Sequence, residues 1–162
     1  MFGFGKKKTV ANDNHLYTPV TGEVIKLDNV SDPVFAGKMM GDGFAVEPTG
    51  DTIVSPVAGK VTIQQGHAVG LERADGLEIL VHIGIDTVSL NGGPFTPRVK
   101  VGDVVDGGDP LAEVDWQQVD DAKLPKTTMV LITNSADKLD NFSVEVGDAT
   151  AGSQIGQAIA ID

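Results

Sequence analysis

The chain contains no cysteine among its 162 residues. Disulfide bonds, thiolate catalysis and cysteine-ligated zinc are therefore excluded, and the composition fits a reducing compartment such as the cytoplasm. Basic residues are also scarce, with 12 lysines and arginines against 23 acidic residues and a formal net charge of -11. Such a charge provides no field that would attract a phosphate backbone, so we expect partners other than nucleic acids.

Long apolar runs are missing as well. No segment approaches the roughly 18 consecutive apolar residues that a membrane-spanning helix requires, so we expect a soluble, cytoplasmic protein. The first residues, Met-Phe-Gly-Phe-Gly-Lys-Lys-Lys, do not have the order of a secretion signal, because the lysines follow the apolar residues. We interpret residues 1–14 as a flexible N-terminal segment, in which residues 1–8 make at most weak contact with a membrane surface.

Helical periodicity over long segments is absent, whereas turn residues are frequent, with 20 glycines and 8 prolines. Short runs rich in Val, Ile and Thr lie between turns that recur about every 8 to 12 residues, a spacing typical of β-sandwiches and barrels. We predict one all-β domain over residues 15–162, an antiparallel sandwich or barrel-like fold. Brief helical turns are expected around 86–90 and 135–140.

One sequence pattern occurs twice. Residues 18–24 read Thr-Pro-Val-Thr-Gly-Glu-Val, and residues 55–61 read Ser-Pro-Val-Ala-Gly-Lys-Val. Both segments follow the pattern Thr/Ser-Pro-Val-x-Gly-x-Val. The repetition predicts two similar hairpins that build two facing layers, an internal quasi-repeat within one domain.

Histidine is another scarce residue, with three in the chain. His82 stands in an almost continuous apolar run at residues 77–85, where a polar ring requires a functional reason. The residues between His67 and His82 are predicted to form a hairpin with its loop in Ala74-Asp75-Gly76. If two of these three residues form the loop, the two imidazoles share one face of the hairpin. If all three form the loop, the imidazoles lie on opposite faces.

Two neighbouring imidazoles suit a transferable phosphoryl group. A neutral ring nitrogen is a nucleophile, and a second ring can hydrogen-bond the phosphate oxygens. The same pair could instead hold zinc, although two ligands leave such a site incomplete. Both histidines could also be ordinary polar residues on a strand face, and the spacing alone leaves these alternatives open.

Several motifs in order resemble one known family. The run from Val81 to Leu90, Val-His-Ile-Gly-Ile-Asp-Thr-Val-Ser-Leu, resembles the phosphorylation segment of the glucose-type IIA proteins of the bacterial phosphoenolpyruvate:sugar phosphotransferase system. The resemblance extends from about Tyr17 to Asn134, with a motif core at about 32–136. Further segments that keep the order and spacing of that family are residues 34–43, 47–50, 55–59, 66–68 and 99–103.

The resemblance implies a phosphotransferase of sugar uptake that needs no cofactor. His82 would accept a phosphoryl group on Nε2 from the phosphocarrier protein HPr and pass it to a cysteine on the IIB domain of a sugar permease. His67 would hydrogen-bond the phosphoryl group and assist its onward transfer. Where the family commonly has a threonine that orients this second histidine, the chain has Gln65, whose side-chain amide could take that role.

The same resemblance implies a shallow site on which partner proteins dock. Its acidic neighbours, Asp32 and Asp86, could meet a basic partner. His67 and His82 could share a zinc ion with such a partner. Each apolar member of the docking surface could alternatively belong to the core. The predicted apolar members are Val34, Phe35, Met40, Ile63 and Leu80.

Three other functions fit parts of the sequence. A regulatory binding protein, whose phosphorylation state reports sugar supply to other proteins, is compatible with the carrier. Biotinyl and lipoyl carriers have strands similar to residues 55–61 and 101–111, but they present a lysine on a hairpin tip, and Lys38-Met39 precedes the first of these segments. A zinc peptidase of the lysostaphin type uses a His-x-His pair, and this chain has Gly84 at the place of the second histidine.

Overall fold

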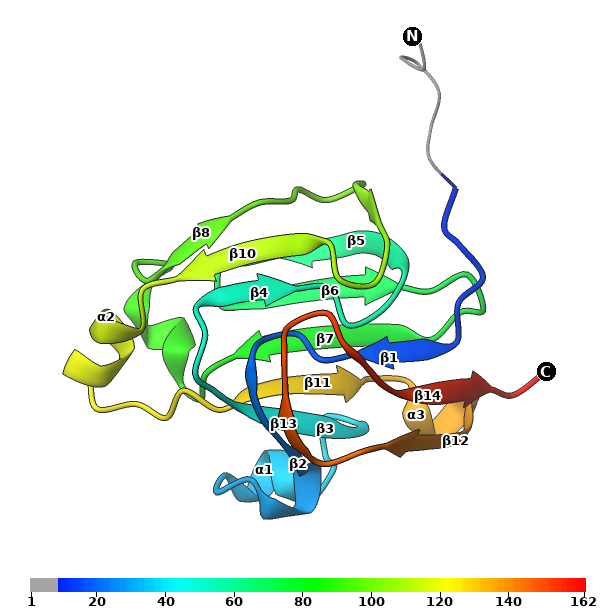
Figure 1. Cartoon of the computed structure of the whole chain (residues 1–162), viewed down its shortest axis with the longest axis horizontal. Coiled ribbons are helices and arrows are strands. Elements are labelled where there is room, and N and C mark those ends of the chain that lie inside the picture. Colours follow the sequence, from blue (N-terminus) through cyan, green and yellow to red (C-terminus); the bar gives the residue numbers. More distant parts are fainter. Residues whose placement is uncertain (1–8) are drawn as a thin grey trace, which may run out of the picture.

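The computed structural model describes residues 9–162, so the predicted membrane contact of residues 1–8 lies outside the described residues. Within residues 9–162 the strands form one eight-stranded sheet and two three-stranded sheets. All strand pairs in these sheets are antiparallel. The predicted antiparallel all-β fold is therefore confirmed, and Figure 1 shows the two small sheets overlying the large one.

The eight-stranded sheet provides the frame for the rest of the fold. In spatial order it contains β13 (Gly147–Ala149), β2 (Gly22–Lys26), β3 (Asp42–Pro48), β11 (Thr128–Ile132), β7 (Glu78–Ile83), β6 (Ala68–Glu72), β5 (Gly59–Gln64) and β9 (Val104–Val105). The two small sheets have the spatial orders β1 (His15–Tyr17), β14 (Gln154–Ala160), β12 (Leu139–Val144) and β4 (Thr52–Val54), β10 (Pro110–Val114), β8 (Phe95–Pro97).

The helical segments of residues 9–162 are short. The predicted turns around 86–90 and 135–140 are present as a 3-10 turn and a one-turn helix. No helix of this part of the chain has the length and apolar character needed to cross a membrane. The segments are η1 (Leu27–Asn29), α1 (Pro33–Ala36), η2 (Thr87–Leu90), α2 (Trp116–Asp121) and α3 (Ser135–Lys138).

Two helices, α1 and α2, were not predicted from the sequence. Each begins after an aspartate whose side chain accepts a hydrogen bond from a backbone N–H two residues later. Asp32 accepts from Val34 at 2.9 Å, and Asp115 accepts from Gln117 at 3.1 Å. This capping pattern is the sequence feature that could have located both helices, although each is too short to show a helical period.

Two apolar clusters contact the eight-stranded sheet. The larger one joins it to both small sheets and includes Val81 and Ile83 of β7. Leu80, the residue before Val81, packs against the smaller cluster, which we call the outer cluster. Because side chains along a strand alternate between its two faces, His82 lies on the same face as Leu80. The outer cluster consists of Leu27, Val30, Ala45, Ile85, Met129 and Leu131, with Ile25, Phe35 and Leu80 packed against it.

The repeated motif has the same local structure in both copies. The hydroxyl of Thr18 donates to the carbonyl oxygen of Val20 at 2.9 Å, and the hydroxyl of Ser55 donates to that of Val57 at 2.6 Å. The motif glycine then begins β2 in one copy and β5 in the other. Both strands belong to the eight-stranded sheet, so the two copies do not start separate facing layers as predicted.

A buried arginine ties the β6–β7 hairpin to the neighbouring sheet. The side chain of Arg73 is 1% exposed, and its Nε and Nη2 donate to the two carboxylate oxygens of Asp75 at 3.1 and 2.5 Å. Nη2 also donates to the carbonyl oxygen of Ala158 in β14 at 2.9 Å and to Oδ1 of Asn14 at 3.1 Å. Asn14 therefore contacts the folded domain, although the sequence assigned it to the flexible segment.

We predict that Arg73→Lys lowers the free energy of unfolding by about 2 to 3 kcal/mol. The ammonium group of lysine cannot reproduce the planar guanidinium, which donates to Asp75, Asn14 and the carbonyl of Ala158 in a buried place. The free energy is measured by urea unfolding. Arg98→Lys is the matched control: its partner is Glu113, both side chains are about half exposed, and the expected cost is below about 1 kcal/mol. Equal losses in the two variants would show that Arg73 has no special role.

Candidate functional site

His82 lies near the end of β7, on the face of the outer cluster, and is half-buried. Its neighbours across the sheet are Ala68 on β6 and Met129 on β11, both of which are buried. The ring of Phe35, from α1, lies with its centroid 5.2 Å from that of the imidazole. Apolar groups from three elements thus surround the imidazole and limit its contact with water.

One hydrogen bond determines which ring nitrogen of His82 carries the proton. Nδ1 lies 2.7 Å from the carbonyl oxygen of Gly84. Because a carbonyl oxygen can only accept, Nδ1 is the donor, and Nε2 of the neutral ring holds the lone pair. Nε2 is therefore the nitrogen that can act as a nucleophile.

Burial lowers the pKa of His82 below its ordinary value of 6.5. Desolvation is the largest cause, since burial disfavours the charged imidazolium. The hydrogen bond to Gly84 opposes this shift, the neighbouring His67 adds to it, and the negative charges of Asp86 and Asp32 oppose it. The net result is a ring that is neutral at pH 7, with its nucleophilic lone pair available.

His67 lies in a tight turn between β5 and β6. The backbone N–H of Gln65 donates to the carbonyl oxygen of Ala68 at 2.9 Å, which leaves Gly66 and His67 as the two loop residues. Gly66 has a φ of 65°, a positive value that two-residue hairpin loops require at their first position. The His67 ring lies edge-on to that of His82, with 5.2 Å between the centroids. The structure therefore brings the two predicted histidines together.

The β6–β7 hairpin has the register that was expected to separate the histidines. Ala68 pairs with His82, and the backbone N–H of Arg73 donates to Leu77, so the loop contains all three residues 74–76. Neither of the two-residue loops that would have joined the imidazoles is formed. The rings meet because His67 precedes the first residue of β6 and is directed by the turn rather than by strand alternation.

Gln65 contacts His67 through its backbone and not through its side-chain amide. Nδ1 of His67 lies 3.0 Å from the carbonyl oxygen of Gln65, so Nδ1 donates and Nε2 holds the lone pair in the neutral ring. Gln65 itself is exposed. The predicted role of its amide is thus corrected, because the orienting group is a carbonyl that any residue at this position would supply.

The five predicted docking residues are all at least partly accessible. Val34, Met40 and Ile63 expose 43%, 41% and 41% of their surface, so they are not core residues. Phe35 and Leu80 are half-buried against the outer cluster. Of the acidic neighbours, Asp32 caps α1 and Asp86 precedes η2, and both influence the pKa of His82. Two other exposed apolar residues, Met39 beside Met40 and Val88 in η2, were not predicted from the sequence.

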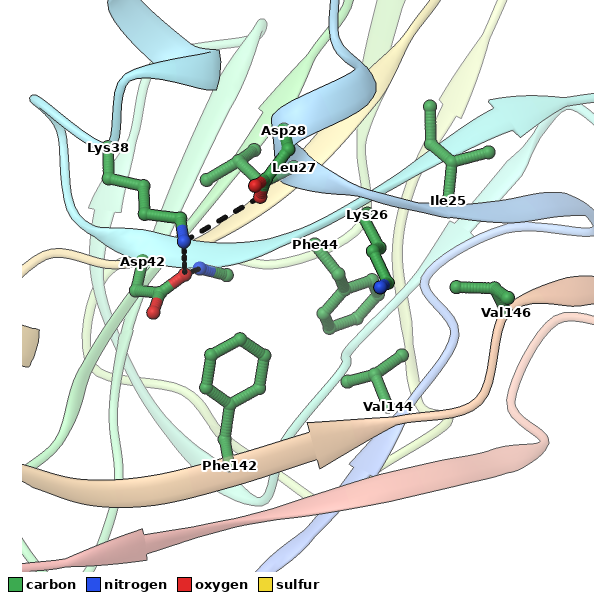
Figure 2. A pocket seen from close by; sticks show the side chains of 11 residues that line it. Ile25, Lys26, Leu27, Asp28, Lys38, Asp42, Phe44, Phe142, Val144 and Val146 are labelled. Carbon is green, nitrogen blue, oxygen red and sulfur yellow. Dashed lines mark hydrogen bonds and ion pairs between the residues drawn. The ribbon is translucent and has the colours of Figure 1, made fainter.

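A separate pocket of about 320 Å³ lies between β2, β3 and β12 (Figure 2). Phe44 and Phe142 line it, and Lys38 at its rim contacts Asp28 and Asp42 with N–O distances of 3.6 and 3.8 Å. None of the predicted site residues lines this pocket. We therefore assign the candidate site to the surface around His82 and not to this pocket.

The two imidazoles offer two ligands for a metal ion. Within residues 9–162, no group of three or more His, Asp or Glu side chains is arranged to hold one. Structural zinc sites take four protein ligands, and catalytic ones take three. A zinc ion shared with a partner stays a prediction, in which the partner supplies the remaining ligands.

Comparisons with known proteins agree on one family. The model of the family described as phosphoenolpyruvate-dependent sugar phosphotransferase system, EIIA 1, matches residues 14–138. A protein of Staphylococcus aureus named PTS system glucose-specific EIIA component is 46% identical over 134 residues, which are 82% of this chain and 81% of the relative. The protein of the same name from Staphylococcus epidermidis is 44% identical over 144 residues, 88% of this chain and 86% of the relative.

A solved structure supports the same relationship. Glucose permease IIA from Mycoplasma capricolum superimposes with a TM-score of 0.78 and is 37% identical in sequence. The match covers 90% of this chain and 96% of that one. The likeness therefore includes almost the whole domain and not only the segments around the histidines.

We predict that Phe35→Ala raises the pKa of His82 towards 6.5, because removal of the ring at 5.2 Å admits water and reduces the desolvation of the imidazolium. The measurement is an NMR titration of the ring protons. Phe142→Ala is the matched control, since it removes a phenyl ring from the separate pocket. An unchanged pKa in Phe35→Ala, or equal shifts in both variants, would contradict this account of the burial.

Proposed function

Since the chain belongs to the EIIA 1 family of the phosphoenolpyruvate-dependent sugar phosphotransferase system, we propose that it carries its phosphoryl group on Nε2 of His82. The chain is a phosphotransferase component, a phosphoryl carrier in sugar uptake. The observation that carries the residue assignment is the 2.7 Å contact of Nδ1 with Gly84. That contact leaves Nε2 as the nucleophilic nitrogen of a ring whose pKa is lowered.

The donor in this proposal is the phosphorylated form of HPr. Nε2 of His82 attacks phosphorus in line with the phosphorus–nitrogen bond of the donor. The new bond to Nε2 forms, the old bond breaks, and its electron pair returns to the donor nitrogen. Apolar groups around the imidazole disfavour water as a competing nucleophile.

The acceptor is a cysteine thiolate on the IIB domain of a sugar permease. Its sulfur attacks the same phosphorus, and the electron pair of the breaking bond returns to Nε2 of His82. His67 assists this step: with Nδ1 bonded to the carbonyl of Gln65, its protonated form offers Nε2–H to the phosphoryl oxygens. No cofactor is part of either transfer.

The surface around the histidines suits docking by proteins. Val34, Met40 and Ile63 supply exposed apolar area, and the acidic charge of the chain favours partners with basic surfaces. The proposed domain spans residues 15–162, and we place the protein in the cytoplasm, where both partners can reach it. The names of the two staphylococcal relatives support glucose as the transported sugar.

We predict that His82→Gln abolishes labelling of the protein by phosphoenolpyruvate, enzyme I and HPr, because the acceptor nitrogen is lost. His67→Gln should still become labelled but should pass the group to the IIB domain at least about tenfold more slowly, since the assisting imidazole is absent. Both rates are measured with labelled phosphoenolpyruvate. Labelling of the His82 variant would contradict the acceptor assignment, and wild-type donation by the His67 variant would contradict the assisting role.

A second prediction concerns the docking surface. Val34→Asp should lower the rate of phosphorylation by limiting phospho-HPr about tenfold, because it places a carboxylate in the apolar contact area. Ile161→Asp is the matched control, since Ile161 is 48% exposed and stands next to the C-terminus, which Figure 1 shows on the side of the view opposite to the end of β7. Initial rates of labelling provide the measurement, and equal rates in the two variants would remove Val34 from the docking surface.

A further inference from the structure

We propose that the side chain of Gln64 is a positioning residue for His67, an inference that rests on the proposed function. Gln64 ends β5, directly before the turn that carries His67. Its Oε1 accepts a hydrogen bond from the backbone N–H of Gly66 at 2.7 Å. The side chain thereby restrains the first of the two loop residues.

The conformation of Gly66 sets the direction in which His67 leaves the turn. Glycine occupies positive and negative φ with similar ease, so its φ of 65° needs restraints from its surroundings. The backbone supplies two restraints: the N–H of Gln65 donates to the carbonyl oxygen of Ala68 at 2.9 Å, and the N–H of Ile83 donates to that of His67 at 2.7 Å. The bond from Gly66 to Gln64 supplies another, and it is the one made by a side chain.

The orientation of the Gln64 amide follows from its partner. Gly66 offers an N–H donor, so the oxygen of the amide must face it, because two donors cannot bond to each other. Nε2 is then left buried, without a hydrogen-bond partner in the described part of the chain. An unpaired buried donor is unfavourable, and water would satisfy it if the side chain turned outward. Packing and the bond to Gly66 therefore outweigh that cost.

The adjacent glutamine provides a comparison within the same turn. Gln65 is exposed and contacts His67 through its backbone carbonyl. Substitution of its side chain leaves that carbonyl in place, whereas substitution of Gln64 removes a hydrogen-bond acceptor. Substitution of Gln64 therefore tests whether a side chain positions His67, whereas substitution of Gln65 leaves the positioning by the backbone unchanged.

The expected effect falls on one of the two transfers. Without the bond to Gln64, Gly66 samples other values of φ, and His67 spends less time beside His82. In the proposed mechanism His82 accepts the phosphoryl group without help from His67, whereas donation to the IIB domain uses both rings. A loss of positioning therefore slows donation more than acceptance.

The test compares four proteins: the wild type, Gln64→Met, Gln64→Glu and the matched control Gln65→Met. Methionine keeps the length of the side chain and removes the acceptor, and glutamate keeps an acceptor oxygen. Labelling by phospho-HPr and transfer to the IIB domain are timed on the same preparations. The unphosphorylated proteins are also compared by NMR, through the ring nitrogen shifts of His67 and the hydrogen exchange of the Gly66 amide.

Gln64→Met should accept the phosphoryl group within about twofold of the wild-type rate and donate it about five- to tenfold more slowly. The Gly66 amide should exchange faster and the His67 ring signals should shift in this variant. Gln64→Glu should recover most of the donation rate, and Gln65→Met should match the wild type in every measurement.

Wild-type donation and unchanged His67 signals in Gln64→Met would overturn the inference and leave the proposed function intact. Equal losses in Gln64→Met and Gln65→Met, or no recovery in Gln64→Glu, would also overturn it. If His82 of the wild type is not labelled, the proposed function fails instead. The NMR comparison would then still decide whether Gln64 orients His67.

Discussion

The hydrogen bond from Nδ1 of His82 to the carbonyl oxygen of Gly84 is the constraint on which the site depends. A neutral imidazole can carry its proton on either nitrogen, and only the other nitrogen is a nucleophile. Burial lowers the pKa of the ring but does not choose between the two nitrogens. The carbonyl makes that choice, so the direction of the peptide after β7 decides which atom reacts.

One face of the eight-stranded sheet packs in the larger apolar cluster, and the opposite face carries the reactive histidine. Val81 and Ile83 face the larger cluster, which joins the sheet to both small sheets. His82, which lies between these two residues in the sequence, faces the outer cluster. A ring in the large cluster would be inaccessible to another protein, and a fully exposed ring would keep its ordinary pKa. At the margin of the outer cluster the His82 ring is partly buried and can still be reached by another protein. The contact with Phe35 adds to its burial.

Sequence reasoning was most successful where one residue conflicts with its surroundings or a motif is specific. A polar ring in an apolar run identified His82, and turn residues predicted the β fold and the helical turns at η2 and α3.

The hairpin register was not predictable, because Ala74-Asp75-Gly76 is compatible with loops of either length. The approach of His67 depends on the backbone of Gly66, and the contact of Phe35 depends on α1, whose four residues show no helical period. Gln64 was missed because its contact is a local bond from a side chain to the backbone.

The central claim concerns one atom, and the position of the phosphoryl group tests it most directly. The protein is labelled with ¹⁵N in its histidine rings and phosphorylated through HPr, and the coupling between phosphorus and nitrogen is then measured by NMR. The account predicts coupling to Nε2 of His82, with Nδ1 of that ring still protonated. Coupling to Nδ1 of His82, or to either nitrogen of His67, would contradict it.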